Sequence, residues 1–167
     1  LSVMEYFILA LVGRARLTSL YAFQQRAGLQ PGGIRTSLQR LEDRGLLERA
    51  KSGSRQRRDF SLTSAGARFL EKTWKHCVAE YPDAESILRA ATVAVLMGDE
   101  HYAAEYLSGM ALTRESSGKE KYMEAERLGS GRLDPLSTYA WMRALTEAQR
   151  REGESDAFSK LGRTLKE

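Results

Sequence analysis

The sequence predicts a mainly α-helical protein with one small β-hairpin, on three observations. Apolar residues recur at helical spacing through most of the 167 residues. Two runs, 46–51 and 57–63, instead have the composition of paired strands around a glycine-bearing turn. Charge is unevenly divided, because residues 1–77 hold 14 lysines and arginines against 6 acidic residues, whereas residues 78–167 hold 12 against 16. We therefore expect two regions of different kind.

Two helices are expected before residue 30. The first, at about residues 2–12, has an apolar stripe broad enough for burial on more than one side, formed by Met4, Phe7, Ile8, Leu11 and Val12. Thr18 is a suitable N-cap for the second helix, and Gly28 is a suitable end. Leu20, Phe23 and Ala27 give this second helix its inward face.

A third helix is expected to open at Pro31, where a first helical turn tolerates proline, and to stop at Gly45. Its inward stripe is Ile34, Leu38 and Leu41. The opposite face is polar and carries Thr36, Gln39, Arg40 and Asp43, with Arg35 on its flank.

The hairpin follows directly, with its tip at residues 52–56. In the second strand, Phe60 and Leu62 alternate with Asp59 and Ser61, which places the two apolar side chains on the inward face. Helix, helix, helix and hairpin is the order of elements in a winged helix-turn-helix, whose third helix enters the DNA major groove. The expected first domain is therefore a DNA-binding winged helix at residues 1–80.

Residues 81–167 are expected to form a second, all-helical domain for dimerisation. Thr63 should cap a fourth helix running to about Tyr81, and Asp83 a fifth ending at Gly98. Asp99 should cap a sixth helix that breaks near residues 116–118 before continuing to Leu128. A loop at 129–131 precedes two further helices, one opened by the pair Asp134 and Pro135 and a last one around Phe158.

Candidate DNA contacts lie on the polar helix face, around the hairpin tip and at the start of the second helix. Arginine can form two hydrogen bonds with a guanine edge and glutamine with an adenine edge. Long cationic side chains can contact the phosphate backbone. The candidates are Thr18, Ser19, Arg35, Thr36, Gln39, Arg40, Lys51, Arg55, Arg57 and Arg58. The alternatives are a solvated helix face, a hairpin edge protected by charge, and plain helix capping by Thr18 and Ser19.

Two further surfaces are inferred from apolar and aromatic residues. A cavity for a small aromatic ligand is one interpretation of Trp74, Tyr81, Tyr102 and Tyr106, and burial in a core is the other. A homodimer interface is expected from the apolar stripes of the first and last helices, since readers of paired half-sites bind as dimers, with a monomeric helical domain as the alternative. Its candidate residues are Phe7, Leu136, Tyr139, Trp141, Met142, Leu145, Phe158, Leu161 and Leu165.

Several classes of protein are not favoured. The only cysteine, Cys77, leaves no intrachain disulfide and no cysteine-rich zinc site, which fits a reducing cytoplasm. His76 and His101 lack companions at metal-ligand spacing, and no cofactor is expected. No phosphate-cradling loop or nucleophile motif is present, so an enzyme is not expected. The longest apolar runs are short of the roughly 20 residues that span a bilayer, and no signal peptide is evident.

Three segments resemble the PadR family of bacterial transcriptional regulators. They are residues 8–12, ILALV; residues 33–47, GIRTSLQRLEDRGLL; and residues 53–66, GSRQRRDFSLTSAG. The most specific parts have the form LxRLExxGLL and RxxFxLTxAG, although other winged helices, including MarR proteins, share milder versions. The resemblance covers residues 1–80, and the remainder resembles the helical domain of longer PadR members only in size and order.

The resemblance implies a cytoplasmic homodimeric repressor with its third helix in the major groove and its wings on the phosphates. A small aromatic effector would relieve repression. The chain departs from the family pattern at Thr18, Ser19 and Leu20, where the family has a His-Gly-Tyr type sequence, and at Arg35 and Thr36, where it has tyrosine and proline. The family's tyrosine contacts DNA, so that role does not transfer to Arg35. A protein-interaction module that binds an acidic partner, or a plasmid or phage replication-initiation factor, remains as an alternative.

Overall fold

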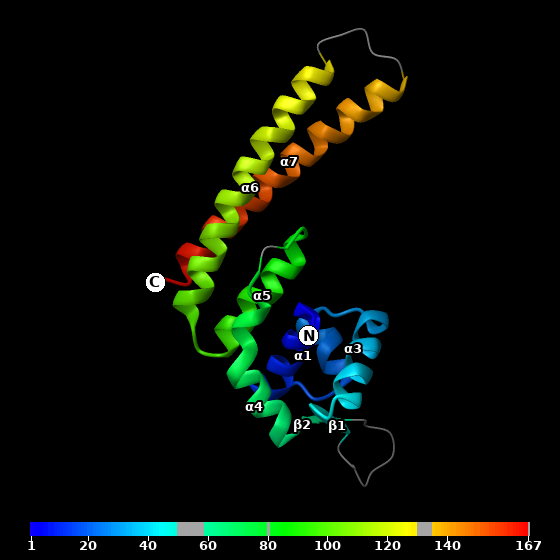
Figure 1. Ribbon diagram of the computed structural model, residues 1–167, viewed down its shortest axis with the longest axis vertical. Helices are drawn as coiled ribbons and strands as arrows, with labels where there is room; N and C mark the ends of the chain where they lie inside the picture. Colours follow the sequence, from blue (N-terminus) through cyan, green and yellow to red (C-terminus); the bar gives the residue numbers. More distant parts are fainter. Residues whose placement is uncertain (50–58, 80, 130–134, 167) are drawn as a thin grey trace. The chain divides into compact units, whose positions relative to one another are not determined.

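The computed structural model describes residues 1–49, 59–79, 81–129 and 135–166, with the backbone alone for residues 128, 129, 135–143 and 145 (Figure 1). Its elements in order are α1 (Val3–Gly13), α2 (Leu20–Ala27), α3 (Pro31–Asp43), β1 (Leu47–Arg49), β2 (Phe60–Leu62), α4 (Ser64–Thr73), the 3₁₀ helix η1 (Trp74–Cys77), α5 (Ala84–Leu96), α6 (Glu100–Gly129) and α7 (Pro135–Thr164). The predicted fold class, a winged helix followed by helices, is confirmed.

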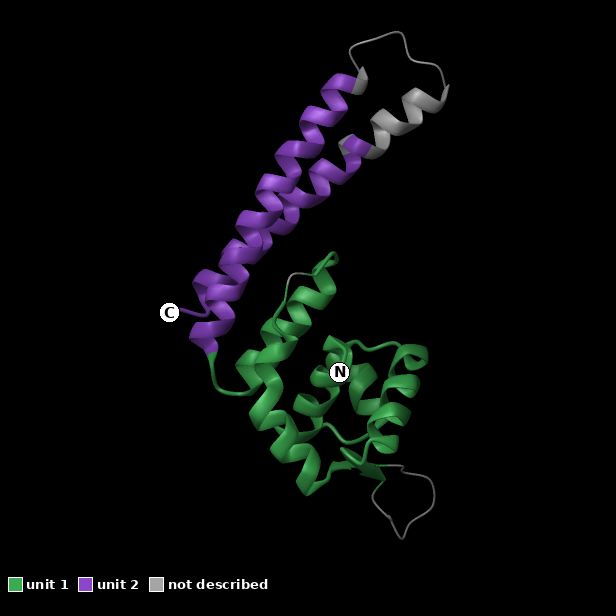
Figure 2. Ribbon diagram, in the orientation of Figure 1, with its two compact units in different colours: residues 1–99 green, residues 100–167 purple. Residues whose placement is uncertain are grey.

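The chain divides into two compact units (Figure 2). Unit 1 comprises residues 1–99 and unit 2 residues 100–167. The fifth helix, α5, packs on α1 and so belongs with the winged helix. The expected domains, a DNA-binding winged helix at residues 1–80 and a helical dimerisation domain at residues 81–167, stay a prediction.

Helix α1 is the centre of unit 1. Its residues from Glu5 to Val12 are all buried, as the broad apolar stripe predicted, and it packs on α3, α4, α5 and β2. A capping box fixes its start, because the Ser2 amide donates to Glu5 Oε2 at 2.7 Å and the Glu5 amide donates to Ser2 Oγ at 3.2 Å. The remaining elements of the unit are thus arranged around a helix that is buried from Glu5 to Val12.

The predicted cap of the second helix was wrong by one residue. Ser19, not Thr18, is the N-cap of α2, and its Oγ accepts from the Ala22 amide at 3.1 Å. Thr18 has a different role, because its carbonyl accepts from the Phe60 amide of β2 at 2.6 Å. Serine and threonine can both cap a helix, so the sequence alone does not distinguish the two positions. The tertiary hydrogen bond from Phe60 to Thr18 does. The predicted end at Gly28 is confirmed by its left-handed φ of 63°.

The hairpin pairs β1 and β2 antiparallel, with Leu47 opposite Leu62 and Arg49 opposite Phe60. Leu46, Asp59 and Thr63, which belong to the predicted runs, lie outside the strands, and residues 50–58, which include the predicted tip, lie outside the described residues. Phe60 is buried, as its predicted inward position requires. The hairpin therefore packs its apolar side against the helices of unit 1.

The fourth helix is shorter than predicted. Thr63 caps α4 as expected, but the α-helix ends at Thr73, and η1 replaces its last turn. Val78 then has extended backbone, so the chain does not continue as a helix toward Tyr81. The Tyr81 hydroxyl donates to the Cys77 carbonyl at 2.6 Å and satisfies one of the acceptors left at the end of η1. Asp83 caps α5, and Gly98, with a φ of 83°, follows it, both as predicted.

Unit 2 is a hairpin of two 30-residue helices, α6 and α7, that pack against each other (Figure 2). The predicted break at 116–118 is wrong, because α6 is continuous, and the two predicted final helices are one. Gly118 lies within this continuous helix beside α7, where a Cβ would lie 3.4 Å from the Cβ of Arg151, an ordinary contact distance. Pro135 opens α7 as predicted, while residues 130–134 of the predicted loop lie outside the described residues.

Candidate nucleic-acid interface

The outward face of α3 is polar along its whole length. Ile34, Leu38 and Leu41 are buried beneath it. Arg35, Thr36, Gln39 and Arg40 are all exposed, so four of the predicted DNA contacts share one accessible helix face. Pro31 at the first position and Gly45, with a φ of 66° just after the last turn, set the limits of that face. The face offers both donors and acceptors to a partner.

Two carboxylates at the end of α3 are each hydrogen-bonded to a neighbouring side chain. Gln39 Nε2 donates to Asp43 Oδ1 at 2.8 Å, one helical turn away. Glu42 accepts two hydrogen bonds from the Arg49 guanidinium, at 2.6 and 2.8 Å. These bonds and the charge of Glu42 raise the pKa of Arg49 above its ordinary value. Both carboxylates therefore orient a polar side chain beside the exposed face.

A shallow groove of about 400 Å³ lies where α3 meets α2 and the hairpin. Its lining residues are Leu20, Arg35, Leu38, Gln39, Arg49 and Phe60. The Arg49 guanidinium lies 6.0 Å from the centre of the Phe60 ring, which is within the range of a cation–π contact. Arginine, glutamine and apolar groups thus meet in a single concave surface.

Arg49 was missed as a candidate by sequence reasoning. It precedes the arginine-rich tip, but its place in the groove depends on the strand register that sets it opposite Phe60 and on its pairing with Glu42. The available signal was its position at the base of a basic hairpin. The predicted contacts Lys51, Arg55, Arg57 and Arg58 lie outside the described residues, so their role stays a prediction.

Thr18 and Ser19 are half-buried at the start of α2. The capping role, one of the two expected for them, is the one that Ser19 has. A contact of either residue with phosphate stays a prediction.

The four candidate effector residues are divided between the units. In unit 1, Trp74 is buried, with Lys75 Nζ 5.3 Å from its ring centre, and Tyr81 is half-buried. Burial is the main cause that raises the pKa of Tyr81. In unit 2, Tyr102 and Tyr106 are half-buried on α6. Their grouping around one ligand stays a prediction.

The candidate dimer residues also differ in exposure. Phe7 and Phe158 are each buried within their own unit, Leu165 is half-buried, and Leu161 is exposed. The side chains of the remaining five lie outside those the structure describes: Leu136, Tyr139, Trp141, Met142 and Leu145. Among the described candidates, Leu161 therefore offers the most apolar surface to a second copy.

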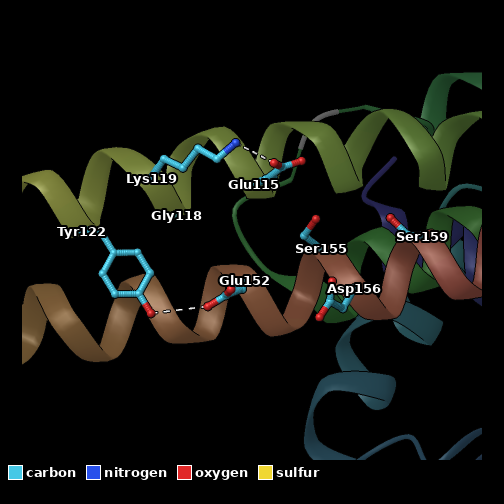
Figure 3. A pocket seen from close by; sticks show the side chains of 8 residues that line it. All are labelled: Glu115, Gly118, Lys119, Tyr122, Glu152, Ser155, Asp156 and Ser159. Atoms are coloured by element: carbon cyan, nitrogen blue, oxygen red, sulfur yellow. Dashed lines mark hydrogen bonds and ion pairs between the residues drawn. The ribbon is translucent and has the colours of Figure 1, made fainter.

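A second pocket, of about 420 Å³, lies between α6 and α7 (Figure 3). Its lining residues are Glu115, Gly118, Lys119, Tyr122, Glu152, Ser155, Asp156 and Ser159. Lys119 Nζ lies 2.6 Å from Glu115 Oε1, and the Tyr122 hydroxyl donates to Glu152 at 3.4 Å. Its carboxylates outnumber its single lysine, which disfavours an anionic ligand. None of the four candidate effector residues lines it.

The described part of the chain contains neither a candidate membrane span nor a candidate metal site. No described helix combines the length and apolar character that crossing a bilayer requires. Histidine, cysteine and acidic side chains form no group of three arranged to hold a metal ion within the described ranges.

Comparison with known proteins gave similarity to solved structures alone. No family model matches the chain, and no curated protein matches it. The structure of Bacillus subtilis PadR in complex with p-coumaric acid is 18% identical over 99% of this chain and 99% of that chain, with a TM-score of 0.41. The structure of Bacillus subtilis PadR in complex with operator DNA is 19% identical over 95% and 99%, with a TM-score of 0.37. At these values the similarity assigns neither ligand nor operator to this chain.

Proposed function

We propose that the protein is a sequence-specific DNA-binding transcriptional regulator that acts as a homodimer, with α3 in the major groove. The observation that carries this proposal is the exposed face of Arg35, Thr36, Gln39 and Arg40 beside the antiparallel hairpin. An α-helix fits the major groove of B-DNA, and these side chains match the hydrogen-bonding groups of base edges. The buried stripe of Ile34, Leu38 and Leu41 holds the helix against α1 and α2 while this face stays accessible.

Charge supports a polyanionic partner for unit 1. Residues 1–99 hold 15 lysines and arginines against 10 acidic residues, whereas residues 100–167 hold 11 against 12. The excess of cations in unit 1 steers it toward phosphates, and the hairpin arginines follow the backbone beside the groove. Unit 2, which is nearly neutral, is free to serve association between two copies.

Homodimerisation follows from the mode of DNA binding. A single α3 reads only a few base pairs, and two copies related by a two-fold axis read half-sites one helical turn apart. The C-terminal helices supply the contact between copies. The regulator acts as a repressor, and a small aromatic effector relieves repression; this last step rests on the family resemblance and on the aromatic side chains of both units.

The experiment is a fluorescence anisotropy titration of the full chain with a duplex from its own upstream region and with an unrelated duplex. Steep salt dependence and tighter binding to the upstream duplex support the proposal. Arg55→Ala and Arg57→Ala should weaken binding to all sequences, whereas Gln39→Ala and Arg40→Ala should change the preference between them. No binding to any duplex at low salt would refute the proposal and favour an acidic protein partner.

The fluorescence of Trp74 and Trp141 can be used to measure effector binding. Binding of an aromatic ligand should quench tryptophan emission and lower DNA affinity together. Quenching without any change in DNA affinity would contradict the effector's role. The sequences of genomic fragments bound by the protein separate a regulator from a replication-initiation factor.

A further inference from the structure

The contact between Gln39 and Asp43 fixes the orientation of an exposed amide at the centre of the α3 face. Gln39 Nε2 lies 2.8 Å from Asp43 Oδ1. A carboxylate only accepts hydrogen bonds at neutral pH, so the NH₂ group of Gln39 must be the end that faces Asp43. The nitrogen and oxygen of a glutamine amide are assigned from their hydrogen-bond partners, and here the carboxylate partner assigns the nitrogen. The carbonyl oxygen of Gln39 points away from the carboxylate.

This orientation decides which hydrogen-bonding groups Gln39 can offer. The N–H trans to the carbonyl oxygen can donate to Asp43, and in that arrangement the other N–H and the carbonyl oxygen remain side by side. Adenine presents an acceptor, N7, next to a donor, the N6 amino group, in the major groove. Guanine presents two acceptors, N7 and O6, and one remaining N–H cannot satisfy both. The fixed amide therefore matches adenine and mismatches guanine.

The surroundings of Gln39 place this amide where a base edge could reach it. Gln39 is exposed and lines the groove between α3 and the hairpin together with Arg35 and Arg49. Both arginines suit phosphate or guanine, and neither presents an acceptor. Asp43 carries a negative charge on the same exposed face, which lowers affinity for a polyanion. Any contribution of Asp43 to DNA recognition is therefore to selectivity and not to affinity.

We propose that Asp43 is a positioning residue that fixes the Gln39 amide for reading adenine. The proposal rests on the proposed function, since it assumes that α3 lies in the major groove. It assigns opposite effects to one carboxylate: Asp43 weakens binding to DNA in general and strengthens the preference for adenine at one position. A purely structural role for Asp43 would instead support binding to every sequence alike.

The experiment selects bound duplexes from a randomised library with the purified full chain and then measures affinities by anisotropy. The wild type should enrich one adenine per half-site, and adenine-to-guanine replacement there should weaken binding about 10-fold. Gln39→Ala should remove that preference. Asp43→Asn, whose side chain can also donate, should reduce it to about 2-fold while leaving binding to an unrelated duplex unchanged or tighter. Asp43→Glu, which keeps the acceptor, should restore the preference.

A matched control is Glu126→Gln, which removes one exposed negative charge from α6 and should change neither preference nor affinity. Loss of affinity for all duplexes alike in Asp43→Asn would overturn the proposal, as would a wild-type consensus that Gln39→Ala leaves unchanged. These outcomes leave the proposed function standing. A wild type that binds no duplex at all refutes the proposed function, and the proposal with it.

Discussion

The two units are stabilised in different ways. In unit 1, short helices begin at capping side chains, as at Ser2, Ser19 and Thr63, and left-handed glycines follow their ends, as at Gly28. In unit 2, two 30-residue helices run side by side, and their register depends on contacts between residues far apart in the sequence. Local signals therefore set where most helices of unit 1 begin and end, whereas the long hairpin depends on cross-helix pairs.

We expect the largest change in the free energy of unfolding when one such pair in unit 2 is broken. Arg114 Nε on α6 lies 2.8 Å from Glu154 Oε2 on α7, with side chains only 6% and 12% exposed, in the geometry of an ion pair rather than a well-aligned hydrogen bond. Arg114→Ala leaves the Glu154 carboxylate paired with Arg150, whose Nη1 lies 3.3 Å from Glu154 Oε1. The expected cost is therefore the low end of that for an unpaired buried charge, about 3 kcal/mol in the free energy of unfolding. Hydrogen exchange of α6 and α7 amides, with urea denaturation, measures this loss.

The control for that prediction is Lys119→Ala, which removes an exposed ion pair with Glu115 on the same helix. Exposed pairs of this kind contribute about 0.5 kcal/mol or less. Equal losses in the two variants would show that the hairpin does not depend on its buried cross-helix pair.

Replacing a glycine by alanine should change the free energy of unfolding in opposite directions in the two units. A Cβ at Gly66 in α4 would lie 2.0 Å from the Leu46 carbonyl oxygen, so Gly66→Ala should cost about 1–3 kcal/mol in unfolding free energy. Gly109 on α6 is exposed, and a Cβ there meets nothing within 4 Å. Gly109→Ala should therefore stabilise the protein by about 0.5–1 kcal/mol. Thermal or urea denaturation of both variants checks the sign, and a stabilising Gly66→Ala would contradict the packing.

We expect the smallest changes in the free energy of unfolding when either of two threonines is replaced. Thr63 Oγ1 accepts from the Gly66 amide at 2.9 Å and donates to the Gly45 carbonyl at 2.7 Å, so Thr63→Ala should cost about 1 kcal/mol. Thr113 Oγ1 only donates to the Gly109 carbonyl within α6, at 3.2 Å. Thr113→Ala should change the free energy of unfolding by less than about 0.5 kcal/mol. Thr63→Ser should recover most of the loss, and failure to do so would show that the hydroxyl is not what stabilises the cap.

Sequence patterns predicted unit 1 better than unit 2, for a physical reason. Caps and stops act over three or four residues, so Pro31, Gly45 and Asp83 were assigned their roles correctly from sequence alone. Glycine in a long helix is ambiguous, because it either ends the helix or admits a neighbour. Gly162 does the second, because a Cβ there would lie 3.1 Å from the Ala104 carbonyl oxygen. The sequence does not contain that neighbour's position.

The candidate site was predicted in part for the same reason. The exposed face of α3 follows from helical periodicity, so the exposure of Arg35, Gln39 and Arg40 was predicted correctly, while their contact with DNA stays a prediction. Arg49 was missed because its role depends on strand register and on Glu42 across the turn. The bond between Gln39 and Asp43 follows an i, i+4 spacing that sequence allows, but its consequence for base reading needed the exposure of both residues.

The most direct test of the account removes one matched cation from each unit. Arg40 is exposed on α3, and Lys160 is exposed on α7. Anisotropy titrations of Arg40→Ala, Lys160→Ala and the wild type with the upstream duplex, at several salt concentrations, measure the contribution of each charge to DNA affinity. If unit 1 meets DNA through α3, Arg40→Ala should weaken binding about 10-fold and Lys160→Ala should leave it unchanged. Equal losses of DNA affinity in the two variants, or a larger loss in Lys160→Ala, would contradict DNA binding through α3.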